Sequence, residues 1–314
     1  MASIADDGEN TTVQEFFCGH GIKESHQKIS LSAFNTATSI TAFLGNFVII
    51  KALENVSSLH LPSKRLLQSL ASSDLCVGLI TQPLYIYSTF APPWPADSEG
   101  CSYTLTYSGF PLRVTGFAFC QVSLLTTTAI SVDRLLALFA GIRYRKVATL
   151  TRVHVFIVFS WLFALIIGLS SYFYTLRVTI FLSIAIALLC VVTSTICYVK
   201  IYLKLRNHHA KVQFQQQESA GKGIPINVAR YRKTVFNAVW VQSTLLVCYL
   251  PYGILTVKSL FTRVDLKSDP AWHATLCLVF LNSSLNPFLY CWKMREVRQA
   301  VKTLTRKCWC LHIN

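Results

Sequence analysis

The sequence predicts an all-α membrane protein: a seven-transmembrane helix bundle with a short amphipathic C-terminal helix. Seven stretches of the chain are long, apolar and almost free of charge. Of the 314 residues, 53% are hydrophobic and 14% are charged, whereas a soluble domain carries about 25% charged residues. The Lys and Arg residues gather in alternate connecting segments, which is typical of loops on the cytoplasmic side of a membrane.

Each apolar stretch is close to the roughly 20 residues that an α-helix needs to cross a bilayer. The predicted spans are Ile29–Ile50, Leu66–Tyr87, Val114–Val132, Val153–Tyr174, Val178–Val199, Thr234–Val257 and Pro270–Trp292. Asp74 is the only formal charge within them. Because a charge in lipid is costly, the few polar residues inside the spans indicate where the function lies.

The distribution of basic residues orients the bundle. Segments 51–65, 133–152, 200–233 and 293–314 hold 22 of the 29 Lys and Arg residues, so we expect these segments inside the cell and the N-terminus outside. A nucleic-acid-binding tail would instead concentrate its charge in one segment. The expected location is therefore the plasma membrane, with the lipid bilayer as the surrounding partner and no nucleic acid.

The predicted organisation has three parts. Residues 1–28 form an extracellular N-terminal tail, residues 29–292 form the bundle, and residues 293–314 form an amphipathic helix and cytoplasmic tail. In the last part, apolar residues recur every three or four positions among Lys and Arg, which indicates a helix lying on the inner leaflet; they are Met294, Val297, Val301 and Leu304. The long inner loop 200–233 is expected to have a mobile centre and basic helical ends that extend spans five and six.

The tail and the chain end carry candidate modification sites. The N-terminal tail lacks the apolar core of a signal peptide, so the first span is expected to direct insertion. Asn10 begins a glycosylation sequon. Cys18 and Cys101 fall on the oxidising side, where they either form a disulfide or remain free thiols. Cys308 and Cys310 follow a basic segment and are candidates for palmitoylation.

Asp74 is expected to face the interior of the bundle and to have polar partners there. Amide and hydroxyl side chains occur at comparable depth in spans one, three and seven, namely Asn46, Ser123, Asn282, Ser283 and Asn286. A carboxylate with neutral oxygen donors suits a hard cation such as sodium. The alternative is a hydrogen-bonded structural cluster around a protonated Asp74.

Several short motifs stand at defined places in the spans. Asp133-Arg134 closes span three, and Trp161 lies in the middle of span four. Pro251 interrupts span six within Cys248-Tyr249-Leu250-Pro251, and Pro287 interrupts span seven within Asn286-Pro287-Phe288-Leu289-Tyr290. A proline inside a helix removes a backbone hydrogen bond and creates a bend or pivot.

With Gly45-Asn46 and Leu70-Ala71-Ser72-Ser73-Asp74, these motifs cover all seven spans in order, and the chain resembles a rhodopsin-like (class A) G-protein-coupled receptor. The resemblance implies a sodium pocket at Asp74, Ser123, Asn282 and Asn286. It implies an activation switch made of Asp133, Arg134, Tyr198, Tyr249, Pro251, Pro287 and Tyr290. It also implies that Arg134 and Ile142 contact a heterotrimeric G protein, and that arrestin and receptor kinases are partners.

The departures from the family pattern narrow the resemblance. Leu135 stands where Tyr is usual, Tyr249 replaces a Trp beneath the ligand, and Cys190 replaces a Pro in span five. Gly109 occupies the place of the usual disulfide cysteine at the top of span three. With a short, cysteine-free second outer loop and no proline in span five, the chain is similar to the melanocortin, lysophospholipid, cannabinoid and adenosine receptors, especially to the melanocortin receptors.

The ligand is constrained mainly by exclusion. Gly116 occupies the place where amine receptors have an Asp, and Phe280 the place where opsins have the retinal lysine, so neither a monoamine nor retinal is expected. A peptide, a lipid or a nucleoside-like ligand is compatible with the sequence. The candidate ligand pocket comprises Arg113, Gly116, Cys120, Tyr249 and Thr256. Arg113 either anchors an anionic ligand group or extends to the lipid head groups.

The sequence also bears on two other function classes. A membrane transporter or channel is the alternative to a receptor, but transporters usually show internal repeats and several charges at mid-membrane depth, whereas this chain has one acid and no repeat. An enzyme is not expected, because no HExxH, GxSxG or CxxC pair stands at an accessible place. The prediction is a receptor for an extracellular ligand, with no cofactor except a regulatory sodium ion.

Overall fold

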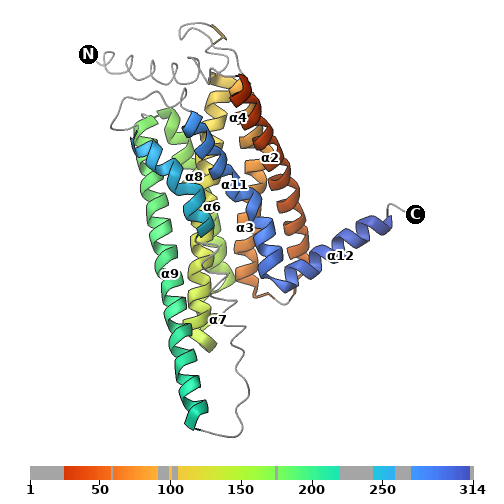
Figure 1. Cartoon of the computed structure of the whole chain (residues 1–314), viewed down its shortest axis with the longest axis vertical. Helices are drawn as coiled ribbons and strands as arrows, with labels where there is room; N and C mark the ends of the chain where they lie inside the picture. The colour runs from red at the N-terminus through yellow and green to blue at the C-terminus, as the bar shows by residue number, and fades with distance from the viewer. Residues whose placement is uncertain are drawn as a thin grey trace.

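A computed structural model describes residues 25–57, 59–90, 99–100, 105–173, 176–218, 243–258 and 270–311. Every regular element in these ranges is helical. Figure 1 shows a bundle of long helices that run side by side. We call the end at which α2 and α11 begin the upper end, as drawn there, and the opposite end the lower end. The predicted all-α bundle is confirmed.

The helices follow the predicted spans closely. Five of them are long and apolar enough to cross a membrane, within α2 (Ser25–Glu54), α6 (Phe110–Ala140), α8 (Leu150–Phe173), α9 (Leu176–Glu218) and α11 (Pro270–Lys293). The sixth predicted span appears as the shorter apolar helix Ser243–Lys258, and residues 234–242 of that span lie outside the described residues. The chain is therefore a multi-pass membrane protein.

The second span is helical but irregular. It consists of α3 (Leu61–Cys76), the π-helical segment η1 (Val77–Thr81) and α4 (Gln82–Phe90). At η1 the chain packs tightly on α2, where Ser39 Oγ donates a hydrogen bond of 2.7 Å to the Gly78 carbonyl. A π segment inside an α-helix adds a residue to the turn and rotates the residues beyond it. It thus fixes which side chains of α4 face the bundle.

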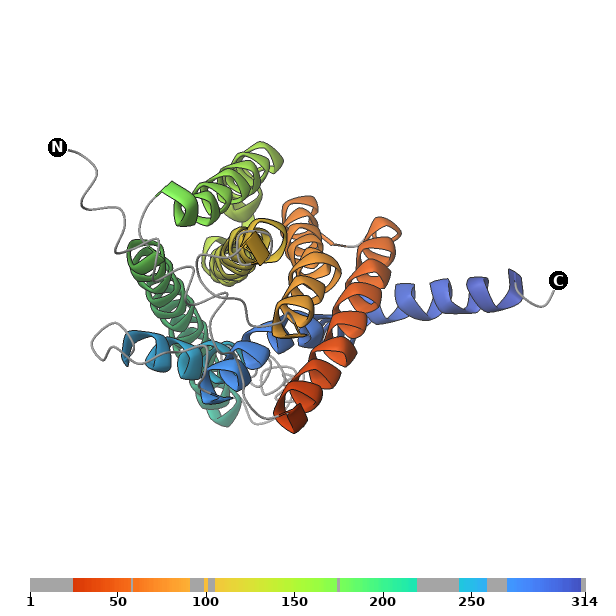
Figure 2. The ribbon, with the colours of Figure 1, turned by 90° about the horizontal axis from the view of Figure 1, so that it is seen from above.

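Helix α6 lies at the centre of the bundle. Seen from above, it stands among α3, α8 and α9, while α2 packs against α3 and α11 (Figure 2). The five-residue π segment η2 (Leu105–Gly109) precedes α6, and η3 (Gly141–Arg143) and α7 (Tyr144–Val147) follow it. Gly141 has a φ of 49°, which a residue without Cβ adopts without strain and which turns the chain toward α7.

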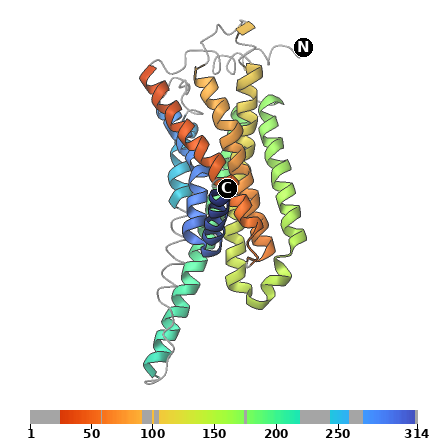
Figure 3. The same ribbon diagram turned by 90° about the vertical axis from the view of Figure 1, so that its right-hand side faces the viewer.

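Helix α9 extends far beyond the bundle. Its 43 residues span about 65 Å at 1.5 Å per residue, against about 30 Å for the bilayer core. Figure 3 shows its lower part projecting below the other helices. This confirms the predicted helical extension of span five; the matching extension of span six falls outside the described residues.

The predicted amphipathic helix is α12 (Arg295–Leu311), which leaves the lower end of α11 and runs away from the bundle (Figures 1 and 2). Its first apolar residue, Val297, is fully buried in a cluster with Ile49, Leu53, Leu67 and Ala71. Met294 and Val301 pack on the same cluster, and Leu304 is half-buried. The apolar stripe therefore anchors the helix under α2.

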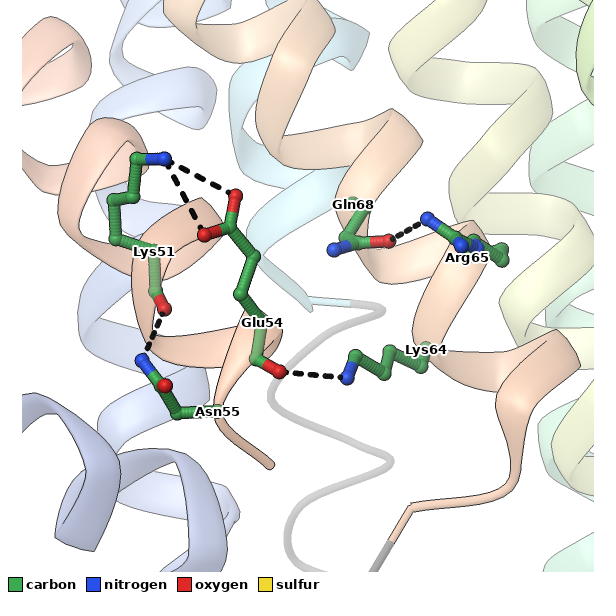
Figure 4. Close-up of polar contacts among 6 residues, drawn as sticks. All are labelled: Lys51, Glu54, Asn55, Lys64, Arg65 and Gln68. Atoms are coloured by element: carbon green, nitrogen blue, oxygen red, sulfur yellow. Dashed lines mark hydrogen bonds and ion pairs between the residues drawn. The ribbon is translucent and has the colours of Figure 1, made fainter. Parts of the chain in front are cut away.

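The turn between α2 and α3 is held by side-chain contacts at the lower end (Figure 4). Lys51 Nζ lies 3.2 Å from Glu54 Oε1 in an exposed ion pair. Lys64 Nζ donates to the carbonyls of Glu54 and Val56 at 3.2 and 3.0 Å, and Asn55 Nδ2 donates to the Lys51 carbonyl at 3.1 Å. Lys64 thus supplies donors to carbonyls at the end of α2, where intrahelical partners are lacking.

Candidate ion site and activation switch

The carboxylate of Asp74 lies at the centre of the bundle and is fully buried. Asn286 Nδ2 donates to Oδ2 at 2.6 Å, and Ser123 Oγ donates to Oδ1 at 3.1 Å. Ser283, which is buried, lies three residues before Asn286 on α11. One acid thus joins α3, α6 and α11, so a change in the relative position of these helices changes the site.

Asn46 and Asn282, the other predicted members, do not hydrogen-bond to Asp74 in the part of the chain that the structure describes. Asn46 Nδ2 donates to the carbonyls of Ala42 and Ser283 at 2.8 and 3.0 Å, which ties α2 to α11. Its Oδ1 is buried and has no hydrogen-bond partner among the described residues. Asn282 is buried next to Ser283 in the sequence.

At the lower end, the carboxylate of Asp133 is held by two neutral hydroxyls. Ser63 Oγ donates to Oδ2 and Tyr144 OH donates to Oδ1, both at 2.7 Å. Ser63 and Tyr144 also contact each other at 3.1 Å. Burial and the hydrogen bond to the Asp133 carboxylate raise the pKa of the Tyr144 phenol, because both favour its protonated form.

Arg134 therefore does not share an ion pair with its neighbour. Among the described residues, the one ion pair joins Lys51 and Glu54. The Arg134 side chain is exposed near the lower end of α6, while Asp133 is only 6% exposed. In this structure the acid therefore contacts α3 and α7, and the arginine is exposed.

The two predicted switch tyrosines lie close to each other. Tyr198 lies on α9. The Tyr290 hydroxyl of α11 is buried, has no hydrogen-bond partner in the described part of the chain, and interacts electrostatically with Asp74 and Tyr198. A buried hydroxyl without a partner costs free energy. A movement that brings the Tyr290 hydroxyl to a hydrogen-bond partner or a water therefore lowers the free energy.

The remaining motif residues occupy defined packing positions. Trp161 Nε1 donates to Ser69 Oγ at 3.1 Å, which joins α8 to α3. Pro287 lies inside α11, and a Cβ added to Gly45 would lie 2.9 Å from its Cγ. Pro251 lies within the helix Ser243–Lys258. Both prolines therefore lie inside helices that continue on either side of them.

The residues of the predicted ligand pocket lie on two facing helices. Tyr249 packs on the cluster of Leu124, Cys190 and Leu245 and interacts electrostatically with Cys120. Gly116 stands opposite the Thr81 methyl group, 3.7 Å from the Cβ that it lacks.

The other two members lie nearer the upper end. Arg113 is half-buried at the upper end of α6, and Thr256, which is buried, lies two turns from Tyr249.

Two polar side chains in the same region were not among the residues predicted from the sequence. Gln121 Nε2 donates to the Ser183 carbonyl at 3.0 Å, joining α6 to α9. The Gln121 Oε1 and Ser183 Oγ atoms are buried without hydrogen-bond partners among the described residues. Both residues interrupt apolar runs, which is the available sequence signal. A second missed cluster, at the upper end between α2, α4 and α11, includes Asn35 and Gln82.

Some predicted positions cannot be placed. Asn10, Cys18 and Cys101 lie outside the described residues. Ile142 is within η3, and Cys308 and Cys310 are within α12, but only their backbones are described.

A bundle of apolar helices around one buried carboxylate, with an exposed arginine near one end, defines a multi-pass membrane protein with a polar centre. The family model for the seven-transmembrane receptors of the rhodopsin family matches residues 45–179 and 170–290. The chain belongs to this family and is a G-protein-coupled receptor. The match gives no support to the transporter alternative.

Among curated proteins, the chain is 26% identical over 313 residues to adenosine receptor A2a of Homo sapiens, covering 86% of this chain and 70% of the relative. It is 23% identical over 292 residues to trace amine-associated receptor 9 of Homo sapiens, covering 85% and 81%. It is 25% identical over 297 residues to trace amine-associated receptor 8b of Rattus norvegicus, covering 85% and 83%. The adenosine receptors are one of the groups that the departures in the sequence indicated.

Proposed function

We propose that the chain is a plasma-membrane receptor whose upper end faces the outside and whose lower end activates heterotrimeric G proteins. The bridge from Ser123 through Asp74 to Asn286 carries the proposal, because it joins three helices around one carboxylate. Lys51, Lys64 and the basic α12 lie at the lower end, which by charge is the cytoplasmic end. Glycosylation at Asn10 and palmitoylation at Cys308 or Cys310 fit this orientation.

Asp74 binds a sodium ion in the resting state. The donors available there are carboxylate, hydroxyl and amide oxygens, including the buried Asn46 Oδ1 that has no partner among the described residues. Oxygen donors suit a hard cation. Ser123 and Ser283 would contribute hydroxyl oxygens to the ion and Asn286 would hold the carboxylate. The ion would stabilise the arrangement of α3, α6 and α11 seen here.

Arg134 engages the G protein. It is exposed near the lower end, while Ser63 and Tyr144 donate hydrogen bonds to the carboxylate of Asp133. Ile142 follows in η3 and would contribute an apolar contact. Arrestin and receptor kinases would bind the same end. A two-state bundle explains the coupling, since an agonist needs only to bind one state better than the other.

The ligand is a neutral polar molecule rather than a monoamine. At Gly116 the amine-binding Asp is absent, although several relatives are named for trace amines. Buried Gln121 Oε1 and Ser183 Oγ accept or donate hydrogen bonds without carrying charge. A nucleoside-like ligand, as the name of the adenosine receptor relative indicates for that protein, has the matching chemistry. The chain is not an enzyme in this proposal.

The test is a ligand screen on cells that express the receptor, with second-messenger readout and with Arg134→Ala as the matched control. We expect neutral polar compounds, nucleosides among them, to activate the parent receptor and not the variant at equal surface expression. Activation by monoamines alone would overturn the ligand class but leave the receptor assignment intact. Equal activation of the variant would overturn the role of Arg134.

A further inference from the structure

At the upper end of the bundle, side chains of α2, α4 and α11 form one buried polar cluster. Tyr85 OH of α4 lies 2.8 Å from His273 Nδ1 of α11. Tyr85 and Cys277 pack in one buried cluster. Asn35 Nδ2 of α2 donates to Cys277 Sγ at 2.9 Å. All four side chains are at most 7% exposed, and none of them belongs to the Asp74 site.

We propose that Tyr85, His273 and Cys277 form a binding site for a zinc ion. His273 and Cys277 stand four residues apart on α11, so their side chains lie on one face of the helix. Imidazole nitrogen, thiolate sulfur and oxygen are the donors that zinc takes, at about 2.0–2.1 Å for nitrogen and about 2.3 Å for sulfur. A nitrogen and an oxygen 2.8 Å apart need only a small displacement to bind the same ion.

The hydrogen bonds already prepare the donors. When the Tyr85 hydroxyl donates to His273, Nδ1 carries the lone pair that a metal requires. The Asn35 N–H group points at Cys277 Sγ and stabilises negative charge on sulfur. Gln82 Nε2 lies 3.4 Å from Asn35 Oδ1 and 2.8 Å from Thr38 Oγ1. These residues form an outer layer that orients the ligands, as is usual around metal-bound side chains.

Zinc binding at this site is a proton exchange. The Cys277 S–H bond breaks, its proton goes to solvent, and a zinc–sulfur bond forms. His273 and Tyr85 bind as neutral imidazole and phenol, and a water completes four ligands. No electron transfer is involved. Asp74, with its oxygen partners, suits hard cations, so the two sites differ in the metals that they select.

The site lies near the upper end of the bundle and joins α4 to α11. His273 is the fourth residue of α11, so its backbone lies about 4.5 Å from the upper start of the helix. Once bound, a zinc ion joins α4 to α11 by coordinate bonds in place of hydrogen bonds. Zinc therefore stiffens the upper end between these two helices.

No group of three or more His, Cys, Asp or Glu side chains able to hold a metal occurs among the described residues. The third protein ligand is a tyrosine, so a search restricted to those four types does not find the site. A neutral phenol is a weaker ligand than a thiolate or an imidazole. The site is therefore suited to a reversible regulatory ion rather than to a permanent structural one.

The experiment uses the purified full-length receptor in lipid nanodiscs, with Zn²⁺ as the probe and Mg²⁺ as the hard-cation control. Binding is measured by isothermal titration and by the shift in thermal unfolding followed by Trp fluorescence. The variants are Cys277→Ser and Tyr85→Phe, which preserve side-chain size, with Asn35→Ala in the outer layer. Cys291→Ser, a half-buried cysteine of the same helix, is the matched control.

We expect one Zn²⁺ per receptor, a raised unfolding temperature and no effect of Mg²⁺. Cys277→Ser should abolish the shift, and Tyr85→Phe and Asn35→Ala should weaken Zn²⁺ binding by about tenfold or more, while Cys291→Ser binds like the parent. Co²⁺ should give a thiolate charge-transfer absorption that Cys277→Ser removes. If Cys277→Ser lowers only the unfolding temperature and leaves Zn²⁺ affinity unchanged, the cluster is a hydrogen-bond network and the metal site is overturned.

Discussion

Replacing Gly78 by Ala should destabilise the receptor through a backbone clash between η1 and α2. An added Cβ would lie 2.8 Å from both Phe43 N and Ser39 O, and 2.9 Å from Ala42 Cβ. Contacts between carbon atoms are favourable at about 3.5–4.0 Å, so α2 must retreat by more than half an ångström, roughly. Two of the three obstacles are backbone atoms, which cannot rotate away.

The magnitude follows from three contributions. Overpacking of a tight contact costs about 1–3 kcal/mol. Separation of the helices also weakens the 2.7 Å hydrogen bond from Ser39 Oγ to the Gly78 carbonyl, worth about 0.5–1.5 kcal/mol. The better helix propensity of Ala returns about 0.5–1 kcal/mol. The expected net loss is about 2 kcal/mol.

The assay is thermal unfolding of the purified receptor with a thiol-reactive dye, since the buried Cys190, Cys197, Cys248 and Cys277 become accessible only on unfolding. A loss of about 2 kcal/mol corresponds to a decrease of roughly 4–8 °C in a domain of more than 150 residues. Gly253→Ala is the control, because nothing lies within 4 Å of an added Cβ there. If Gly78→Ala unfolds at the temperature of the parent or of Gly253→Ala, the close approach of η1 to α2 is wrong.

Three further predictions concern the sites. Asp74→Asn should remove the sodium dependence of agonist affinity, because an ion bound to the resting state opposes any agonist that prefers the other state; radioligand competition in sodium and in choline measures it. Stability should fall as the pH rises above about 10, the ordinary phenol pKa, since the raised pKa keeps Tyr144 protonated only in the folded state; unfolding temperatures of Tyr144→Phe should depend less on pH. If the screen yields an anionic agonist in place of a neutral one, Arg113→Ala should weaken it by about 1.5–3 kcal/mol, and Arg113→Lys should restore only part, as measured by potency at matched expression.

Each of these has a result that contradicts it. Equal agonist affinity in sodium and in choline for the parent receptor would remove the ion from Asp74. An identical alkaline decline of stability in Tyr144→Phe would mean that the Asp133 contact does not govern that decline. Unchanged potency of Arg113→Ala toward an acidic agonist would assign Arg113 to the lipid head groups.

The spans could be predicted from the sequence because lipid imposes one strong requirement, a long run of apolar residues. The same requirement isolates Asp74, and comparable depth then predicts Ser123 and Asn286 as its partners, which the hydrogen bonds confirm. The apolar stripe of α12 could also be predicted, because Met294, Val297, Val301 and Leu304 recur every three or four residues among basic neighbours, and Val297 is fully buried.

Other features depend on contacts that the sequence does not encode locally. Nothing in the chain near Asp133 indicates that Ser63 and Tyr144 hold it, because these residues are 70 and 11 positions away. The π segment η1 adds one residue to a turn and leaves the apolar run unchanged. Asn35, Gln82 and Cys277 read as small or polar residues in separate helices, and only packing at the upper end brings them together.

The most direct measurement of the central claim is guanine-nucleotide exchange by heterotrimeric G proteins with the purified receptor in nanodiscs, in choline buffer and with an agonist from the screen. The parent receptor should accelerate exchange on at least one class of Gα, and sodium should reduce the rate. Arg134→Ala should abolish the acceleration while agonist still binds. Exchange by Arg134→Ala at the rate of the parent would contradict the proposal that Arg134 engages the G protein.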